Sequence, residues 1–329
     1  MNEENGGSNL HTPVMVGQVL EYLDVEHKPD GTFLDATTST GGHSRAVAEE
    51  MSGDGELICL DLDRMALRTA KDRLEGTPPR VALYQANFSE IDRVLEIEGG
   101  VRLDGILFDL GFSSFQIDDP ERGFSFQKEG PLDMRMNQEG ELTAAEVVNK
   151  YERGELKRII SKYGEKRWAG RIAYKIVEAR KRERISTTGD LVTVIREAIP
   201  GRAQRASSIH PATKTFQALR IHVNGEMKNL QRGLDKAFDG LKIGGTMVFL
   251  SYHSLEDRRV KKFFNYKEKD CICPPELPVC RCDKEREMEI LTSGAERPSV
   301  DEVANNPRAR SARLRAGRRL QQEKESGNP

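Results

Sequence analysis

The feature that most constrains the fold is an alternation of short apolar runs with amphipathic stretches between residues 32 and 109. The runs are rich in β-branched and aromatic residues, as buried strands are, and the stretches between them have the three- and four-residue apolar spacing of helices. Such alternation predicts a parallel sheet covered by helices. The expected strands are Thr32–Thr37, Glu56–Asp61, Val81–Gln85 and Gly105–Asp109, and the expected helices are Ser44–Met51 and Met65–Leu74.

The alternation stops after Asp109. From about residue 143 to residue 199 nearly every segment has a helical period, and no strand run interrupts it. We therefore predict one doubly wound α/β domain, residues 1–115 and 213–329, interrupted by a helical insert at residues 116–212. The later elements of the α/β domain are expected to be a long helix, Thr213–Leu241, and strands at Thr246–Leu250, Glu289–Thr292 and Ser311–Arg315.

Charge is unevenly distributed along the chain, whose net charge is −2. Between Lys150 and Arg205 there are 16 Lys or Arg residues against 7 Asp or Glu residues, so this segment carries +9 and the remainder about −11. A basic segment attached to an acidic remainder is typical of an RNA-binding module joined to an enzyme. A solvated helical bundle with ordinary surface charges explains the same counts.

Hydropathy and cysteine content restrict the class of protein. No apolar stretch approaches the roughly 18 residues needed to span a bilayer, and the first residues have no signal-peptide pattern, so we expect a cytoplasmic protein without a membrane partner. Five cysteines are too few for a secreted disulfide framework, but four of them crowd together. In a reducing compartment such a cluster suggests a zinc site more than disulfides, although Cys-x-Cys is tighter than the usual spacing. A loop of free or redox-sensitive thiols is the alternative, and the sequence leaves the choice between the two open. The cluster comprises Cys271, Cys273, Cys280 and Cys282.

Residues that could bind a cofactor follow four consecutive expected strands. Ligands of open α/β sheets bind at the carboxyl ends of strands. Gly41 and Gly42 follow the first strand and allow close backbone approach before a helix N-terminus, while Asp61 ends the second, where a ribose diol would bind. Phe88 follows the third and could pack on an adenine, and Asp109 ends the fourth. Each is also common as a turn or cap residue. Their succession favours an adenosine cofactor, and the absence of Gly-x-Gly-x-x-Gly disfavours a dinucleotide.

Six sequence blocks follow one another from Asp109 onward. They are Asp109–Asp118 (DLGFSSFQID), Arg122–Phe126 (RGFSF), Gly130–Met136 (GPLDMRM), Thr215–Arg220 (TFQALR), Ser251–Arg258 (SYHSLEDR) and Asn306–Ser311 (NPRARS). In these blocks, and over a match from His11–Pro13 nearly to Arg315, the chain resembles the RsmH (MraW) family of ribosomal RNA cytosine-N4 methyltransferases.

The resemblance implies a class I (Rossmann-like) S-adenosylmethionine methyltransferase with an inserted all-helical domain that recognises RNA. It implies S-adenosylmethionine as the methyl donor and a cytosine in the decoding region of 16S ribosomal RNA as the acceptor. The partner is then small-subunit ribosomal RNA, either naked or in the assembled 30S subunit, and the sequence leaves open whether the protein is a homodimer. The alternatives are a methyltransferase of the same fold that acts on another RNA nitrogen and a non-catalytic ribosome-assembly factor.

The resemblance also implies site residues. Of the two catalytic candidates, Asp109 could accept a hydrogen bond from N4 or hold the amino group of the cofactor. His253 could polarise the base or take the released proton, or it could be a hydrogen-bonded structural histidine. The implied cofactor-binding residues are Gly41, Gly42, His43, Asp61, Phe88, Asp109 and Gln116.

An RNA-binding surface should offer a flat apolar face for an unstacked base and cationic side chains for the flanking phosphates. The two phenylalanines among the candidates are equally candidates for an ordinary core. The RNA-binding candidates are Arg122, Phe124, Phe126, Arg135, Arg308 and Arg310.

Three residues depart from the family pattern. Ser39 stands where the family has the first glycine of its glycine-rich turn, Phe115 stands where proline is frequent, and Tyr252 stands where phenylalanine is frequent. If the turn needs a positive φ at this position, the serine adds strain of about 1 kcal/mol or crowds the ligand. Either effect would weaken cofactor binding.

Overall fold

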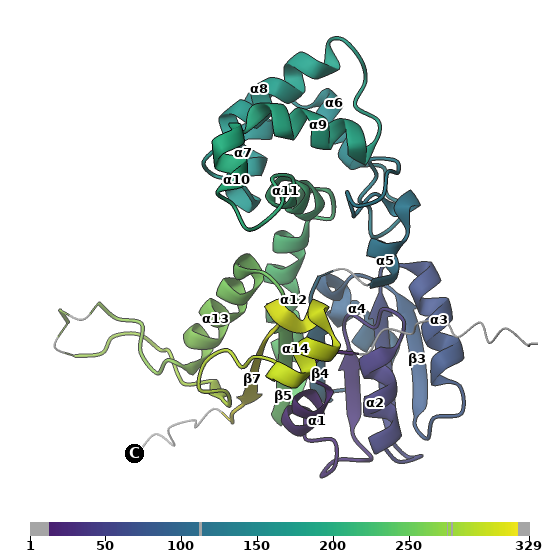
Figure 1. The fold of residues 1–329 in the computed structure, drawn as a ribbon. Helices are drawn as coiled ribbons and strands as arrows, with labels where there is room; N and C mark the ends of the chain where they lie inside the picture. Colours follow the sequence, from purple (N-terminus) through teal and green to yellow (C-terminus); the bar gives the residue numbers. More distant parts are fainter. Residues whose placement is uncertain (1–12, 112–113, 275, 278, 322–329) are drawn as a thin grey trace, which may run out of the picture. The chain divides into compact units, whose positions relative to one another are not determined.

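The computed structural model describes residues 13–111, 114–274, 276–277 and 279–321 and divides the chain into two compact units (Figure 1). The first unit comprises residues 1–61, 65–111 and 231–329, and the second unit comprises residues 62–64 and 112–230. The predicted insert, residues 116–212, lies within the second unit. Of the matched sequence blocks, His11, Thr12, Phe112 and Ser113 lie outside the described residues.

The first unit contains a seven-stranded sheet in the order β3-β2-β1-β4-β5-β7-β6. Five strands, β1 to β5, run parallel to their neighbours within the sheet, whereas β7 is antiparallel to both β5 and β6. The predicted α/β class is therefore confirmed. The strands are β1 (Thr32–Asp35), β2 (Glu56–Asp61), β3 (Arg80–Gln85), β4 (Leu103–Asp109), β5 (Leu241–Ser251), β6 (Met288–Ile290) and β7 (Arg313–Arg319).

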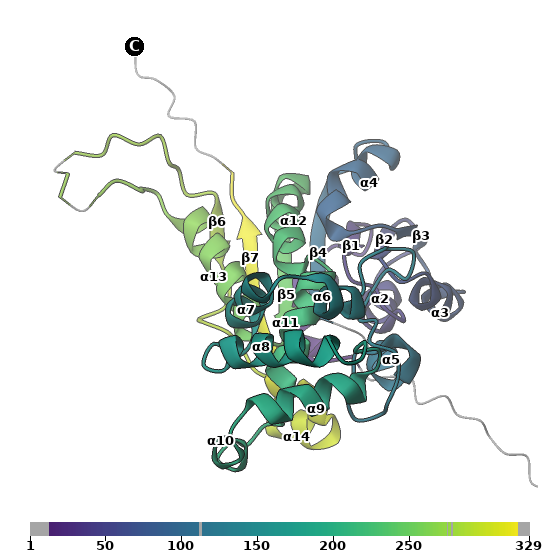
Figure 2. The same ribbon diagram turned by 90° about the horizontal axis from the view of Figure 1, so that it is seen from above.

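Helices cover both faces of this sheet because successive strand residues point to opposite faces. Leu107 and Val248 face a core shared with the helices on one side, whereas Phe108 and Phe249 stack at 4.5 Å on the other. Figure 2 shows α2 and α3 on one side of the strands and α4 and α12 on the other. The helices are α1 (Val16–Leu23), α2 (Gly42–Glu50), α3 (Arg64–Leu74), α4 (Ile91–Ile97), α12 (Glu226–Gly240), α13 (Ser254–Glu268) and α14 (Val300–Asn305).

The second unit is helical, as its sequence period predicts. The hydroxyls of Thr143 and Thr187 cap α6 and α9 by accepting hydrogen bonds from main-chain N–H groups in the first turn. Apolar side chains at helical spacing, such as Ile160, Ile172 and Ile195, form its core. No helix among the described residues is both long and apolar enough to cross a membrane. The helices are α5 (Ser114–Asp118), α6 (Ala144–Lys150), α7 (Arg153–Tyr163), α8 (Ala169–Arg180), α9 (Thr188–Ala198), α10 (Gly201–Arg205) and α11 (Thr213–Val223).

The prediction of a single long helix over Thr213–Leu241 is wrong. The chain instead forms two helices, α11 and α12, with a break at Asn224 and Gly225. Gly225 has a φ of 59°, a left-handed conformation that ends a helix. The Asn224 side chain donates to the carbonyls of Met134 and Arg220 and so stabilises the break. The last strand also differs from expectation, since it begins at Arg313 and runs to Arg319.

Candidate active site

The turn after β1 is fixed by a buried carboxylate. Asp35 accepts hydrogen bonds from the Ser44 hydroxyl at 2.6 Å and from the Thr37 main-chain N–H at 3.0 Å. Burial raises the pKa of Asp35, against the opposing effect of the Ser44 hydrogen bond. Because Ser44 lies in the first turn of α2, these contacts tie the β1 turn to the N-terminus of that helix.

Gly41 and Gly42 begin α2 with bare backbone. Gly41 has a φ of 80°, and a Cβ at this position would lie 3.2 Å from the Cα and Cβ of Ala70. A Cβ on Gly42 would lie 3.3 Å from Pro13. Glycine is therefore favoured by conformation at Gly41, and a Cβ at either position would make a tight contact with its neighbour. The main-chain N–H groups at the start of a helix also favour a negatively charged ligand group.

Ser39 lies in the left-handed region, with a φ of 50°. Its main-chain N–H donates to the Asp61 carboxylate at 2.7 Å, so the conformation places this N–H at the carboxyl end of β2. The position therefore has the positive φ for which a glycine is suited, and a non-glycine residue there costs about 1 kcal/mol or more.

We expect Ser39→Gly to have a free energy of unfolding about 1 kcal/mol higher than that of Ser39→Ala, because alanine keeps the Cβ that disfavours a positive φ. Both variants lack the hydroxyl, so their difference isolates the backbone conformation. Urea unfolding followed by circular dichroism measures it. An alanine variant as stable as the glycine variant would show that Ser39 is not held at positive φ in solution.

Asp109, at the end of β4, is held between two side chains of the first unit. The Tyr252 hydroxyl donates to Asp109 Oδ1 at 2.8 Å, and His43 Nδ1 lies 3.5 Å from Asp109 Oδ2. Burial and the Asp109 charge raise the pKa of Tyr252 well above its ordinary value, so this hydroxyl keeps its proton at neutral pH. The Asp109 side chain is 26% exposed. The carboxylate is thus fixed in position while part of it stays accessible.

Phe88 and Gln116, both predicted to bind the cofactor, belong to different units. Phe88 follows β3 in a short 3₁₀ helix, and its ring meets the Phe108 ring edge-on at 5.7 Å. The parallel register of β1 to β4 places the ends of these strands, and therefore Phe88, Asp61 and Asp109, along one edge of the sheet. Gln116 lies buried in α5 of the second unit, where its amide donates to Asp63 at 3.0 Å.

His253 is the N-cap of α13. Its Nδ1 accepts from the Glu256 main-chain N–H at 3.4 Å, and the Glu256 carboxylate accepts in return from the His253 main-chain N–H at 3.3 Å. This reciprocal pair satisfies N–H groups that would otherwise lack partners at the helix start. The structure thus gives His253 a structural role, which leaves a role toward substrate as a proposal.

A basic pocket of about 330 Å³ lies beside Tyr252. Arg313, which lines this pocket, donates to Asp257 at 2.8 Å. Burial alone would raise the pKa of Asp257, but hydrogen bonds from Arg315 and Arg313 hold that pKa below its ordinary value. Sequence reasoning missed Arg297 and Tyr252 as site residues, because only the tertiary fold brings the segments around them together. The pocket is lined by Tyr252, His253, Ser254, Arg297, Arg310, Ser311, Ala312 and Arg313.

The four predicted RNA-binding arginines fall into two groups, one exposed in the first unit and one paired with carboxylates in the second unit. Arg308 and Arg310 form the exposed group. Arg122 is 3% exposed and its guanidinium lies 2.6 Å from the Asp63 carboxylate. Arg135 donates to both oxygens of Asp133.

The two phenylalanines of the second unit have protein partners. Phe124 is buried in the core of that unit, with the Arg122 guanidinium 5.8 Å from its ring centroid. Phe126 is half-buried, stacks on His210 at 4.6 Å and meets Phe216 edge-on at 5.1 Å. In the structure as it stands, both rings pack as core residues do.

The second unit also has a basic pocket, of about 560 Å³. Arg167 and Arg171 lie over the Trp168 ring at 4.9 and 5.6 Å, and Arg153 lies over the Tyr174 ring at 5.2 Å. Tyr174 is 46% exposed. Cations interleaved with aromatic rings can bind phosphates and stacked bases. The pocket is lined by Arg153, Lys157, Lys166, Arg167, Gly170, Arg171 and Tyr174.

Comparisons with known proteins give a consistent result. A family model described as the MraW methylase family matches residues 8–320. A protein of Heliobacterium mobile named ribosomal RNA small subunit methyltransferase H is 46% identical, over 94% of this chain and 99% of its own. Proteins of the same name from Syntrophotalea carbinolica and Symbiobacterium thermophilum are each 48% identical over 94% of this chain, and over 98% and 97% of their own lengths.

Proposed function

Because this chain belongs to the MraW methylase family, we propose that it transfers a methyl group from S-adenosylmethionine to the exocyclic N4 of a cytidine in the decoding region of 16S ribosomal RNA. The relatives are named for methylation of small-subunit ribosomal RNA, which supports this class of substrate. The RNA is naked or part of an assembled 30S subunit, and such a substrate implies a cytoplasmic location. The observation that carries the proposal is the Asp109 carboxylate, fixed by Tyr252 at the carboxyl edge of the sheet.

The carboxyl edge of the first unit fits S-adenosylmethionine, which supplies an electrophilic methyl group on a sulfonium. Bare backbone is present at Gly41 and Gly42, and at Gly111, whose φ of 121° suits only glycine. We assign the first turn of α2 to the methionine end of the cofactor, the Asp61 carboxylate to the ribose hydroxyls and Phe88 to the adenine ring.

Asp109 has the chemistry that the acceptor needs. The amino group of cytosine is a poor nucleophile, because its lone pair is delocalised into the ring. A carboxylate that accepts a hydrogen bond from N4 favours a pyramidal nitrogen with a localised lone pair, and it can then take the proton that N4 loses. Tyr252 fixes one oxygen of Asp109, which reduces the reorganisation that the carboxylate must undergo.

The two basic pockets support RNA as the substrate. In the first unit, Arg297 and Arg310 line a pocket that also contains Tyr252, the residue that contacts Asp109. In the second unit, five Lys or Arg residues line the pocket, and its described lining includes no Asp or Glu residue. Phosphate contacts of this kind position the RNA backbone but do not select the base. Base selection is therefore assigned to the surroundings of Asp109.

A non-catalytic assembly factor is the alternative, and the strained Ser39 is the observation that favours it. The experiment incubates the purified protein with isotope-labelled S-adenosylmethionine and with unmethylated 30S subunits or naked 16S RNA, followed by mass spectrometry of the nucleosides. We expect labelled N4-methylcytidine. Label in a different nucleoside would contradict the proposed acceptor. Absence of both label and cofactor binding would favour the assembly factor.

A further inference from the structure

A long loop joins α13 to β6 and projects from the first unit (Figure 1). Its base is fixed by polar contacts: the Glu287 main-chain N–H donates to the Lys267 carbonyl at 2.8 Å, and the Lys267 ammonium donates to the Glu287 carboxylate at 2.6 Å. Farther out, its apolar side chains are exposed, at 49% for Ile272, 43% for Leu277 and 67% for Val279. Burial of these three side chains therefore contributes little to the stability of the outer loop.

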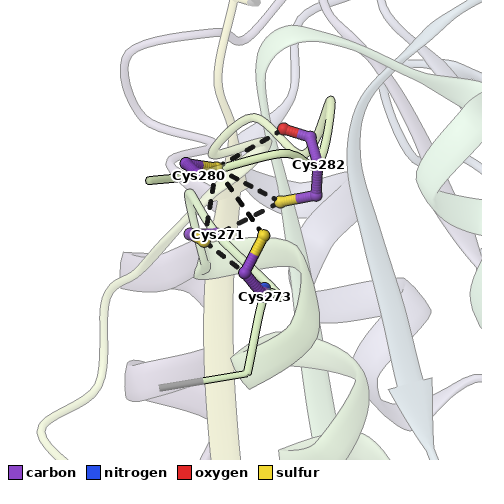
Figure 3. A group of neighbouring side chains, drawn as sticks. All are labelled: Cys271, Cys273, Cys280 and Cys282. Atoms are coloured by element: carbon purple, nitrogen blue, oxygen red, sulfur yellow. Dashed lines mark hydrogen bonds between the residues drawn. The ribbon is translucent and has the colours of Figure 1, made fainter. Parts of the chain in front are cut away.

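Four cysteines gather in this outer loop (Figure 3). All four Sγ atoms lie within 4.8 Å of one another, and none is in a disulfide. The Sγ atom of Cys280 lies 3.5 Å from that of Cys271, 3.9 Å from that of Cys273 and 3.6 Å from that of Cys282, and the Cys271 and Cys282 Sγ atoms are 3.8 Å apart. The cluster therefore brings together the two Cys-x-Cys pairs of the loop.

We propose that these four cysteines bind one Zn²⁺ ion in a closed, structural site. A tetrahedron of thiolates with Zn–S bonds of about 2.3 Å has S···S edges of about 3.8 Å, and the four distances given above lie close to that value. Four protein ligands leave no open coordination position, so the ion holds structure and does not activate water. On binding, each thiol releases its proton to solvent, and no oxidation or reduction is involved.

Main-chain N–H groups support thiolate ligands. The Ile272 N–H donates to Cys282 Sγ and the Arg281 N–H donates to Cys273 Sγ, both at 3.3 Å. Hydrogen bonds to sulfur stabilise its charged form, as outer-shell partners of metal ligands do. Both donors belong to residues between paired cysteines, so the two Cys-x-Cys segments orient each other. The ion would then cross-link the two sides of a loop whose apolar side chains Ile272, Leu277 and Val279 are exposed.

The first test is the metal content of the full-length protein purified under reducing conditions, by elemental analysis. We expect one zinc per chain, and loss of most of the bound zinc for Cys280→Ser, because this variant lacks one of the four proposed ligands. Cys59→Ala is the matched control: Cys59 is buried in β2, where burial raises the pKa of its thiol to about 12, so its loss should leave the zinc content unchanged. Less than a tenth of an equivalent of zinc after reconstitution with excess Zn²⁺ would overturn the proposal, as would stoichiometric iron.

A second test does not depend on purification history. Metal-free protein titrated with Co²⁺ should develop the thiolate charge-transfer band and the d–d bands of tetrahedral Co²⁺, saturating at one equivalent. Arg281 is exposed between two ligands, so trypsin should cleave after it in metal-free protein and much more slowly in zinc-loaded protein. Octahedral Co²⁺ spectra, or disulfides among these cysteines in protein kept reduced, would overturn the proposal. These readouts are independent of methyl transfer, so failure of either proposal leaves the other standing.

Discussion

Asp109→Asn is expected to lower kcat/KM for methyl transfer to ribosomal RNA by about 10²- to 10³-fold, the usual effect of removing one preorganised electrostatic group from an active site. Asparagine has the same shape and keeps one acceptor oxygen, but it lacks the charge that would attract the N4 proton. The carboxylate is not needed for folding in the way a core residue is, since its side chain is 26% exposed. Transfer of label to 16S RNA under kcat/KM conditions measures the effect.

Tyr252→Phe is the matched control for this variant. It removes the hydroxyl that donates to Asp109 Oδ1 but leaves the carboxylate, so we expect a fall of about tenfold or less. The dissociation constant of S-adenosylmethionine separates the two roles of Asp109. An unchanged constant in Asp109→Asn supports contact with N4, whereas a constant that rises with the loss of activity supports contact with the amino group of the cofactor. Activity within threefold of the unmodified protein would refute both roles.

Arg122→Met is expected to lower the free energy of unfolding of the second unit by about 3–5 kcal/mol, because it breaks a buried ion pair by removing the guanidinium next to the Asp63 carboxylate. Both side chains are 3% exposed, and their charged atoms are 2.6 Å apart. The Arg122 guanidinium also donates to the carbonyls of Arg135 and Met136 at 3.0 Å. The single tryptophan of the chain, Trp168, belongs to the second unit, so its fluorescence during urea unfolding reports on this unit.

The double variant Arg122→Met with Asp63→Asn is the control for that result. Asp63→Asn removes the buried negative charge that Arg122 neutralises. The double variant should therefore be more stable than Arg122→Met alone. If Arg122→Met has the same urea midpoint of unfolding as the unmodified protein but binds RNA more weakly, Arg122 contacts RNA and does not stabilise the fold through an ion pair.

Periodicity and turn chemistry made much of the sheet predictable. The four strands and two helices predicted between Thr32 and Asp109 match observed elements to within a few residues, because their signals are local and repeat every two or 3.6 positions. Helix α4, Ile91–Ile97, was not predicted. The same reasoning placed Asp61 and Asp109 at the ends of strands. It failed at Asn224–Gly225, where a helical apolar pattern continues across a break that depends on contacts between the Asn224 side chain and the distant Met134 and Met136.

The sequence by itself determined the fold class, the helical nature of residues 143–199, and the positions of Asp61 and Asp109 at the ends of strands. Only the tertiary structure decided which side chains meet: Tyr252 with Asp109, 143 positions apart, and Arg122 with Asp63, 59 positions apart. It also decided that the two Cys-x-Cys pairs come together, with their four Sγ atoms within 4.8 Å of one another. The physical reason is that secondary structure follows from local backbone preference and apolar period, whereas hydrogen bonds and ion pairs between distant residues depend on how strands and loops are brought together by the whole fold.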